Sequence, residues 1–304
     1  MKLASHVVRI LVILIAILFV TVLIAVGTLY YQAHRAPGGS SDYVAMGSSF
    51  AAGPGVGVQA SGSPSGCLRS TSGYPSLVAK ALDLGLTDVT CSGATSLHVL
   101  DGGQMFLPPQ VDALRPHTQL VTVTIGGNDV GFLGNSFSWT CQNDRDNVPL
   151  IWRMGVCRGV MTEAQVDAAL EALPGRLDRL SREVRRRSPK ATLVYVDYLT
   201  FLPEQGSCPD RLPLTAAQLT RAHYVEHRLA EITAHAAKAG GAILVPASQL
   251  SKGHDVCSAD PWVFGKSFPS SMLSWGPMPF HPNQKGMDAM AKAVVEAVQA
   301  KGKL

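Results

Sequence analysis

The stretch YVAMGSSFAAGPG, from Tyr43 to Gly55, joins a short apolar run to a glycine-rich turn. Its first residues, Tyr43–Met46, are typical of a strand that is buried on both faces, as strands of a parallel sheet are. Ser48 and Ser49 follow at the point where this strand would end. The stretch therefore predicts either a strand that delivers a nucleophilic serine into a turn or an ordinary loop after a strand.

Further apolar runs rich in Val, Ile and Thr alternate with helical patterns along the chain. We expect strands also at 88–91, 120–125, 192–197 and 242–245. We expect long helices at 74–84, 162–187, 215–239 and 283–299, and the second of these begins with a capping-box sequence. Alternating strands and helices predict right-handed crossovers, a parallel sheet and helices on both of its faces.

Two long segments, 131–159 and 251–280, are expected to stay irregular, and long ordered loops at sheet ends often carry function. Both contain several aromatic residues. Packing of the loops is the first interpretation of each ring, and lining a pocket for an acyl chain is the second. These residues are Phe132, Phe137, Trp139 and Trp152 in one segment and Trp262, Phe264, Phe268 and Trp275 in the other.

The amino terminus carries an uncharged apolar run, Ile10–Leu29. At 1.5 Å per residue it reaches about 30 Å, enough to cross a bilayer. Lys2 and Arg9 precede it and favour an orientation with the amino terminus inside. A signal peptide has a shorter apolar region of about 7–15 residues and an A-x-A-like cleavage site. We expect an uncleaved membrane anchor over 1–33, with a cleaved signal segment as the alternative, and a linker over 34–41.

Six cysteines all lie beyond the apolar run, and none forms a C-x-x-C pair. This pattern fits an oxidising compartment and three disulfides better than a zinc site. Six cysteines allow 15 pairings, so the sequence does not fix them. The simplest arrangement is sequential: Cys67–Cys91, Cys141–Cys157 and Cys208–Cys257.

Chemistry-bearing residues follow three of the expected strands and open the last helix. The three strands end at Ser49, Gly93 and Asn128, and His281 stands before the final helix. Each residue alone is more typical of a turn or a helix cap. Together they supply a nucleophile, a base and oxyanion donors, which are the groups that acyl transfer needs, and the carboxyl edge of an open α/β sheet is where ligands bind.

Four blocks of this sequence resemble those of the SGNH hydrolases, also called GDSL-type lipases and esterases. The blocks are Gly47-x-Ser49, Gly93, Gly127-Asn128 and His281, in the family's order, and the resemblance covers 42–304 as one domain. It implies a flavodoxin-like, three-layer α/β/α sandwich with a five-stranded parallel sheet. The six-cysteine layout also resembles that of secreted bacterial lipases of the family, which implies the sequential pairing. No G-x-S-x-G elbow surrounds the serine, which argues against the α/β-hydrolase fold.

The resemblance implies a role for each matched residue. Ser49 would be the nucleophile and His281 the base that takes its proton. The N–H groups of Ser49 and Gly93 and the side-chain amide of Asn128 would form the oxyanion hole. Ser48 stands where the family often has aspartate, so it marks a departure from the pattern and is not the attacking serine.

A second departure concerns the group that orients His281. Many family members have an aspartate three residues earlier, where this sequence has Met278. The backbone carbonyls of Met278 and Pro279 are therefore the candidates to hold the imidazole, and Asp255 and Asp260 are more distant ones. A carbonyl orients the ring but stabilises the imidazolium less than a carboxylate does, so we expect an active enzyme with a weaker base.

Other functions fit the sequence less well. The net charge of +4 is too small to indicate a nucleic-acid partner. His254 and Asp255 alone are weak support for a metal site, and the glycines of 53–57 lack the Gly-Lys-Ser/Thr that phosphate binding needs. We expect no metal and no cofactor.

The sequence as a whole predicts a monomeric serine esterase or lipase outside the membrane. Its substrate would be a carboxylic ester, such as a lipid or acyl ester. An acyltransferase or a polysaccharide deacetylase with the same site is the alternative within enzymes. A catalytically silent surface-binding module is the alternative from another class.

Overall fold

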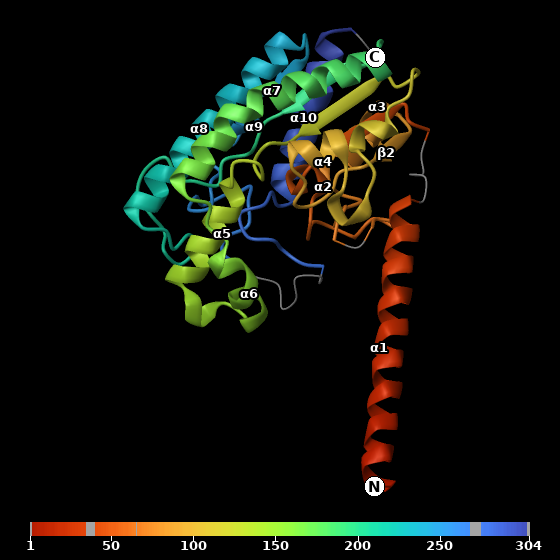
Figure 1. The fold of residues 1–304 in the computed structure, drawn as a ribbon. Coiled ribbons are helices and arrows are strands. Elements are labelled where there is room, and N and C mark those ends of the chain that lie inside the picture. The colour runs from red at the N-terminus through yellow and green to blue at the C-terminus, as the bar shows by residue number, and fades with distance from the viewer. Residues whose placement is uncertain (1, 35–39, 65, 268–274, 303–304) are drawn as a thin grey trace.

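The computed structural model of the 304-residue chain describes residues 2–34, 40–64, 66–267 and 275–302. Most of the expected linker, 35–39, and Phe268 of the second aromatic segment lie outside the described residues. The described chain forms a three-layer α/β/α sandwich with a long separate helix at its amino terminus (Figure 1).

The middle layer is a five-stranded parallel sheet with the strand order β2-β1-β3-β4-β5. The central strands are fully buried, because helices cover both of their faces. The register aligns Gly47 at the end of β1 with Thr124 at the end of β3. The strands are β1 (Tyr43–Gly47), β2 (Leu86–Asp88), β3 (Leu120–Thr124), β4 (Thr192–Val196) and β5 (Ile243–Val245).

Helices form the two outer layers. On one face α3 (Tyr74–Leu82) packs against α10 (Gln284–Ala300), and on the other α7 (Glu163–Arg187) packs against α8 (Ala216–Ala239) (Figure 1). In α7 the apolar stripe recurs every three or four residues, as the helical pattern predicts; its buried residues include Val166, Leu170, Leu173, Leu177, Leu180 and Val184.

Short helical segments connect these elements near the carboxyl edge of the sheet. They include α2 (Ser49–Ala52), α4 (Ser96–Asp101) and α9 (Ala247–Leu250). Four 3-10 turns accompany them in the described chain: η1 (Gln104–Phe106), η2 (Gln110–Ala113), η3 (Arg145–Asn147) and η4 (Val156–Arg158).

Two sequence expectations differ from the structure. The segment 131–159 is largely helical, with α5 (Phe132–Asn143) and α6 (Leu150–Gly155), where an irregular loop was expected. The strand expected at 88–91 begins earlier, at Leu86, and ends at Asp88, the last residue in register with β1. Residues beyond it still donate backbone hydrogen bonds to β1, from Val89 to Ala45 and from Cys91 to Gly47.

Three disulfides brace the carboxyl-edge segments: Cys67–Cys91, Cys141–Cys157 and Cys208–Cys257. Cys141–Cys157 joins α5 to η4 across a separation of 16 residues, and a small apolar cluster surrounds it. Val148 and Trp152 belong to this cluster, and Met278 packs against it. Packing of Met278 against the cluster around this disulfide thus connects the α5–α6 segment to the chain just before His281.

The amino-terminal helix α1 (Lys2–His34) contains one candidate membrane span, His6–Thr28, with a mean hydropathy of 3.3. None of this span is buried in the protein. A long exposed apolar helix and three disulfides together fit an extracytoplasmic or secreted protein.

Candidate active site

The first site element is the turn from β1 into α2. Ser48 is the N-cap of α2 and Ser49 its first residue, so the Ser49 side chain stands at the carboxyl edge of the sheet. A Cβ at Gly47, whose φ is +132°, would lie 2.3 Å from the Thr124 carbonyl oxygen. Only glycine permits this close approach of β1 to β3.

Gln110 of η2 fixes the same turn from the other side. The Gly47 N–H donates to its Oε1 at 2.7 Å, and its Nε2 donates to the Gly47 carbonyl oxygen at 3.0 Å. This buried amide thus pairs with both backbone polar groups of Gly47, just before the serine turn.

His281 lies next to Ser49 although the two are 232 residues apart in the sequence. Its Nε2 is 2.7 Å from Ser49 Oγ, and its Nδ1 is 2.8 Å from the Pro279 carbonyl oxygen. A neutral ring whose Nδ1–H donates to Pro279 presents Nε2 as the acceptor of the serine proton. This is the geometry of a nucleophile with an oriented general base.

The two backbone carbonyls expected to orient His281 accept hydrogen bonds from different groups. The Pro279 carbonyl accepts from the imidazole, whereas the Met278 carbonyl accepts from the backbone N–H of His281 at 3.3 Å. Both distant carboxylates have other partners. Asp255 accepts from the Cys257 N–H, and Asp260 pairs with Lys285.

The environment of His281 is apolar. Its ring lies 5.2 Å from the Phe50 ring and is stacked 5.8 Å from that of Phe137, centroid to centroid. Burial lowers the pKa of His281 to about 4, and the hydrogen bond to the Pro279 carbonyl opposes this shift only in part. The imidazole is therefore neutral, and able to accept a proton, over most of the pH range.

The expected oxyanion donors come from three segments at the carboxyl edge of the sheet. Asn128, which follows β3, donates its Nδ2 to the Ala94 carbonyl oxygen at 2.8 Å, and this bond orients the amide. Gly93 has a φ of +81° and is exposed in its turn. Within the described residues, the backbone N–H groups of Ser49 and Gly93 donate no hydrogen bond. All three donors retain an N–H for a developing oxyanion.

Tyr198, just after β4, is a site residue that the sequence analysis missed. Its buried hydroxyl accepts from the Gly127 N–H at 3.0 Å and lies 3.1 Å from Ser48 Oγ. Burial raises the pKa of Tyr198 far above its usual range, so the hydroxyl stays protonated. The tyrosine thus bridges the serine turn and the turn that carries Asn128. A single tyrosine after a strand has no sequence feature from which this contact could be predicted.

Asp129 is the second such residue. Its fully buried carboxylate accepts from the N–H and the hydroxyl of Ser96 and from Arg176 Nη1 at 3.0 Å. Ser96 opens α4, two residues after Ala94, so Asp129 ties the Gly93 turn to the Asn128 turn. Its position directly after Asn128 in Gly-Gly-Asn-Asp is the sequence feature that could have indicated this role.

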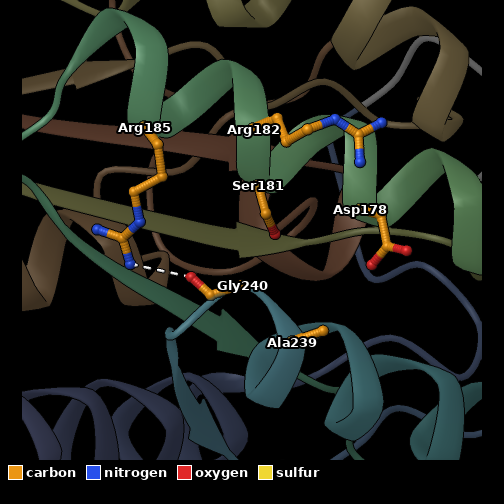
Figure 2. A pocket seen from close by; sticks show the side chains of 6 residues that line it. All are labelled: Asp178, Ser181, Arg182, Arg185, Ala239 and Gly240. Atoms are coloured by element: carbon orange, nitrogen blue, oxygen red, sulfur yellow. Dashed lines mark hydrogen bonds between the residues drawn. The ribbon is translucent and has the colours of Figure 1, made fainter.

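A separate cavity lies between α7 and the end of α8 (Figure 2). Its lining includes Arg185, whose guanidinium donates to the carbonyl oxygens of Ala191, Gly240 and Gly241. These are the helix ends that precede β4 and β5, so the cavity is at the amino edge of the sheet, opposite Ser49. Arg185 there joins helix ends and is structural.

A parallel α/β sandwich with a serine hydroxyl bonded to a buried histidine at its carboxyl edge is typical of serine-type ester hydrolases. The profile of the GDSL-like Lipase/Acylhydrolase family matches residues 45–289. The chain belongs to this family, and it is a carboxylic ester hydrolase. The resemblance and the fold expected from the four sequence blocks are thereby confirmed.

Named relatives agree with this assignment. Lipase 2 of Streptomyces coelicolor is 33% identical over 292 residues, which cover 90% of this chain and 92% of the relative. Among solved structures, phospholipase A1 from Streptomyces albidoflavus is similar with a TM-score of 0.64, and the extracellular lipase from Streptomyces rimosus with 0.65. Each of these two is 27% identical, and each match covers 85% of this chain and 98% of the solved chain.

Proposed function

We propose that the protein hydrolyses esters through an acyl-enzyme on Ser49. The observation that carries this proposal is the 2.7 Å contact between Ser49 Oγ and His281 Nε2. As Oγ attacks the ester carbonyl, its proton passes to Nε2 and a bond forms between Oγ and the acyl carbon. The resulting imidazolium gives the proton to the leaving alkoxide, and the ester C–O bond breaks.

Water completes the cycle in the same site. His281 takes a proton from water, the hydroxide attacks the acyl carbon, and the acyl–Oγ bond breaks while Ser49 regains its proton. In both tetrahedral intermediates the oxyanion would accept from the N–H groups of Ser49 and Gly93 and from the Asn128 amide. The Pro279 carbonyl would keep Nδ1 protonated throughout.

We infer that the substrate is a lipid or other acyl ester outside the membrane. The rings of Phe50 and Phe137 beside His281 make the surroundings of the reacting atoms apolar. Similar proteins are named as lipases and as a phospholipase A1. We further propose that α1 stays uncleaved as the membrane anchor, with the linker at 34–41 and the catalytic domain at 42–304. One chain supplies every catalytic group, which supports a monomer.

The test is an assay of the full chain with p-nitrophenyl esters of increasing chain length. We expect hydrolysis and covalent labelling by a fluorophosphonate, and we expect Ser49→Ala to abolish both. Ser48→Ala is the matched control, and it keeps the labelling because its hydroxyl does not attack. Folded wild-type protein that neither hydrolyses an ester nor takes the label would disprove the proposal.

The same series separates the competing substrate classes. A lipase or long-chain esterase will prefer medium or long acyl groups, whereas a polysaccharide deacetylase will accept acetyl alone. Adding an alcohol acceptor tests for acyl transfer, because a transferase would form a new ester in place of the free acid.

A further inference from the structure

Exposed apolar side chains gather on two segments that flank the catalytic pair. On one side Met105 and Phe106 of η1 are 41% and 57% exposed. On the other side Leu150 and Met154 of α6 are 65% and 67% exposed. Several large apolar side chains with this exposure on two segments beside one site are typical of an interaction surface.

The η1 segment adjoins the oxyanion turn. Gln104 Nε2 donates to the Ser92 carbonyl oxygen at 2.7 Å, one residue before Gly93. The backbones of Met105 and Phe106 have φ angles of 48° and 64°, a left-handed conformation that is uncommon for bulky residues. The protein thus holds two apolar side chains outward beside the site at a cost in backbone strain.

The α6 segment adjoins the histidine. Its Trp152 is buried in the apolar cluster against which Met278 packs, three residues before His281. Leu150 and Met154 are four residues apart and share the opposite, outer face of the helix.

Basic side chains accompany this apolar face. Arg145 precedes α6, Arg158 follows it, and both are exposed. Arginines beside exposed apolar residues are typical of segments that bind at the surface of a membrane with anionic head groups.

The position of α1 relates this surface to a bilayer. α1 contacts η1, and its span ends at Thr28, just before the exposed Tyr30 and Tyr31, residues of the kind that lie at the membrane interface. In Figure 1 α6 is at the lower end of the sandwich, the side on which α1 projects away from it. β1 begins nine positions after His34, so it starts within about 30 Å of the end of α1.

We propose that the catalytic end of the sandwich docks on the bilayer that α1 spans, with η1 and α6 entering the lipid interface on either side of Ser49 and His281. This inference rests on the membrane attachment proposed above. A lipid ester would then pass from the leaflet to the serine without crossing water, and a soluble ester would gain nothing from the docking.

Tryptophan scanning in vesicles tests the docking directly. The full chain carries its native tryptophans at 139, 152, 262 and 275 and none in α1. We place Phe106→Trp, Leu150→Trp and, at the amino edge of the sheet, the exposed control Lys190→Trp in vesicles of brominated phosphatidylcholine and phosphatidylglycerol. The first two are expected to be quenched beyond the wild-type background, and the control is not.

Kinetics of polar variants supply the second measurement. We replace Met105 and Phe106 by asparagine, which tolerates left-handed backbone, and in a second variant Leu150 and Met154 by glutamine. Each pair is expected to slow hydrolysis of an ester embedded in the vesicle about tenfold, since less apolar area enters the lipid. Hydrolysis of a short soluble ester is unchanged. Tyr224→Gln on α8, which is 43% exposed, is the control and loses neither activity.

Several outcomes would overturn the docking. Quenching of Lys190→Trp alone would show that the opposite edge faces the lipid. Unquenched tryptophans at 106 and 150 in a chain that runs as a dimer would show that a second copy covers the surface. Release of the chain without α1 would remove the attachment on which the inference rests. Because quenching needs no turnover, an inactive wild type would disprove the proposed function alone.

Discussion

At His281 a neutral backbone carbonyl takes the place where a carboxylate would stabilise the imidazolium. The Pro279 carbonyl fixes the tautomer, but it contributes only a dipole against the cost of burying a charge. Burial therefore decides the pKa of His281 and lowers it to about 4. The ring is a weak base, so the driving force for proton transfer from Ser49 is small. It is neutral over most of the pH range, however, so nearly every molecule can accept the proton.

This pKa predicts an unusual tolerance of acid. Only the neutral imidazole accepts the Ser49 proton, so a lowered pKa moves the acid limb of activity downward. We expect kcat/KM to hold from about pH 8 to about pH 5 and to be halved near pH 4. The measurement is kcat/KM for a neutral soluble ester across this range, with circular dichroism showing that the protein stays folded. An acid limb near the ordinary histidine pKa of about 6.5 would mean that water reaches the ring in the working enzyme.

Tyr198 and Ser48 form a contact that connects two turns of the site. The tyrosine hydroxyl joins the nucleophile turn to Gly127, and a Cβ at Gly127 would lie 2.7 Å from the tyrosine ring. In the proposed mechanism both turns must keep their spacing so that Ser49 and Asn128 act on one carbonyl group. The bridge sets that spacing without touching the substrate, so Tyr198 is a positioning residue.

Replacing the bridge predicts a loss of turnover without a loss of binding. Tyr198→Phe leaves the Gly127 N–H buried without its acceptor, and the turn of Asn128 shifts. We expect kcat to fall about tenfold with KM unchanged, whereas Asn128→Ala, which removes a donor itself, costs about 10²–10³ in kcat. Steady-state kinetics of both variants, of Ser48→Ala and of Ser48→Ala/Tyr198→Phe check this. If the double variant lost the simple product of the two single losses, the two hydroxyls would be independent.

The sequence could indicate the residues proposed to do the chemistry but not the residues that hold them in place. Ser49, Gly93 and Asn128 were recognisable because each follows a strand and parallel strands end at one edge. Tyr198 and Gln110 act through a single hydroxyl and a single amide, and nothing in their neighbours distinguishes them from core residues. Such contacts depend on distances across the sheet, which no local pattern contains.

At the scale of elements, the helices α5 and α6 were not apparent from the sequence. FLGNSFSWTCQN, the sequence of α5, contains glycine, serine, threonine and asparagine, which have low helix propensity. The helix exists because Phe132, Leu133 and Cys141 are buried, so tertiary packing overrides the local preference. By contrast α7 has a regular stripe and a capping box at Thr162, and its sequence pattern was sufficient.

The Cys141–Cys157 disulfide is expected to maintain this weakly helical segment. Replacing both cysteines by alanine removes a cross-link over 16 residues, which lowers the free energy of unfolding by about 3 kcal/mol. Turnover also falls, because the segment supports Met278 beside His281. Urea unfolding and ester hydrolysis at low temperature measure the two effects.

The Cys208–Cys257 pair provides the comparison. It spans 49 residues, so its removal is expected to cost about 1 kcal/mol more stability. An unchanged unfolding midpoint in the Cys141→Ala/Cys157→Ala variant would show that packing alone maintains α5 and α6.

At the scale of the whole molecule, the proposed anchor α1 and the proposed docking of the catalytic edge depend on each other. In the proposed anchored form, the exposed apolar span of α1 and the short connection to β1 would keep the sandwich near the bilayer at a high effective concentration. Sequence alone could predict the candidate span, since its length and apolar composition are read directly from the residues. It could not predict the proposed docking surface, because Met105, Phe106, Leu150 and Met154 are scattered over two segments.

The whole-molecule prediction is that the native chain keeps α1. Residues 10–29 exceed the apolar length that signal cleavage favours, so the chain is expected in the membrane fraction with an intact amino terminus. Mass spectrometry of the purified chain and release by detergent, but not by salt, measure this. Arg35→Ala is the control for cleavage, because with Ala33 it completes an A-x-A pattern directly after the apolar helix. Soluble wild-type protein truncated near residue 35 would show that α1 is a signal segment, and the lipid would then have to hold η1 and α6 without a tether.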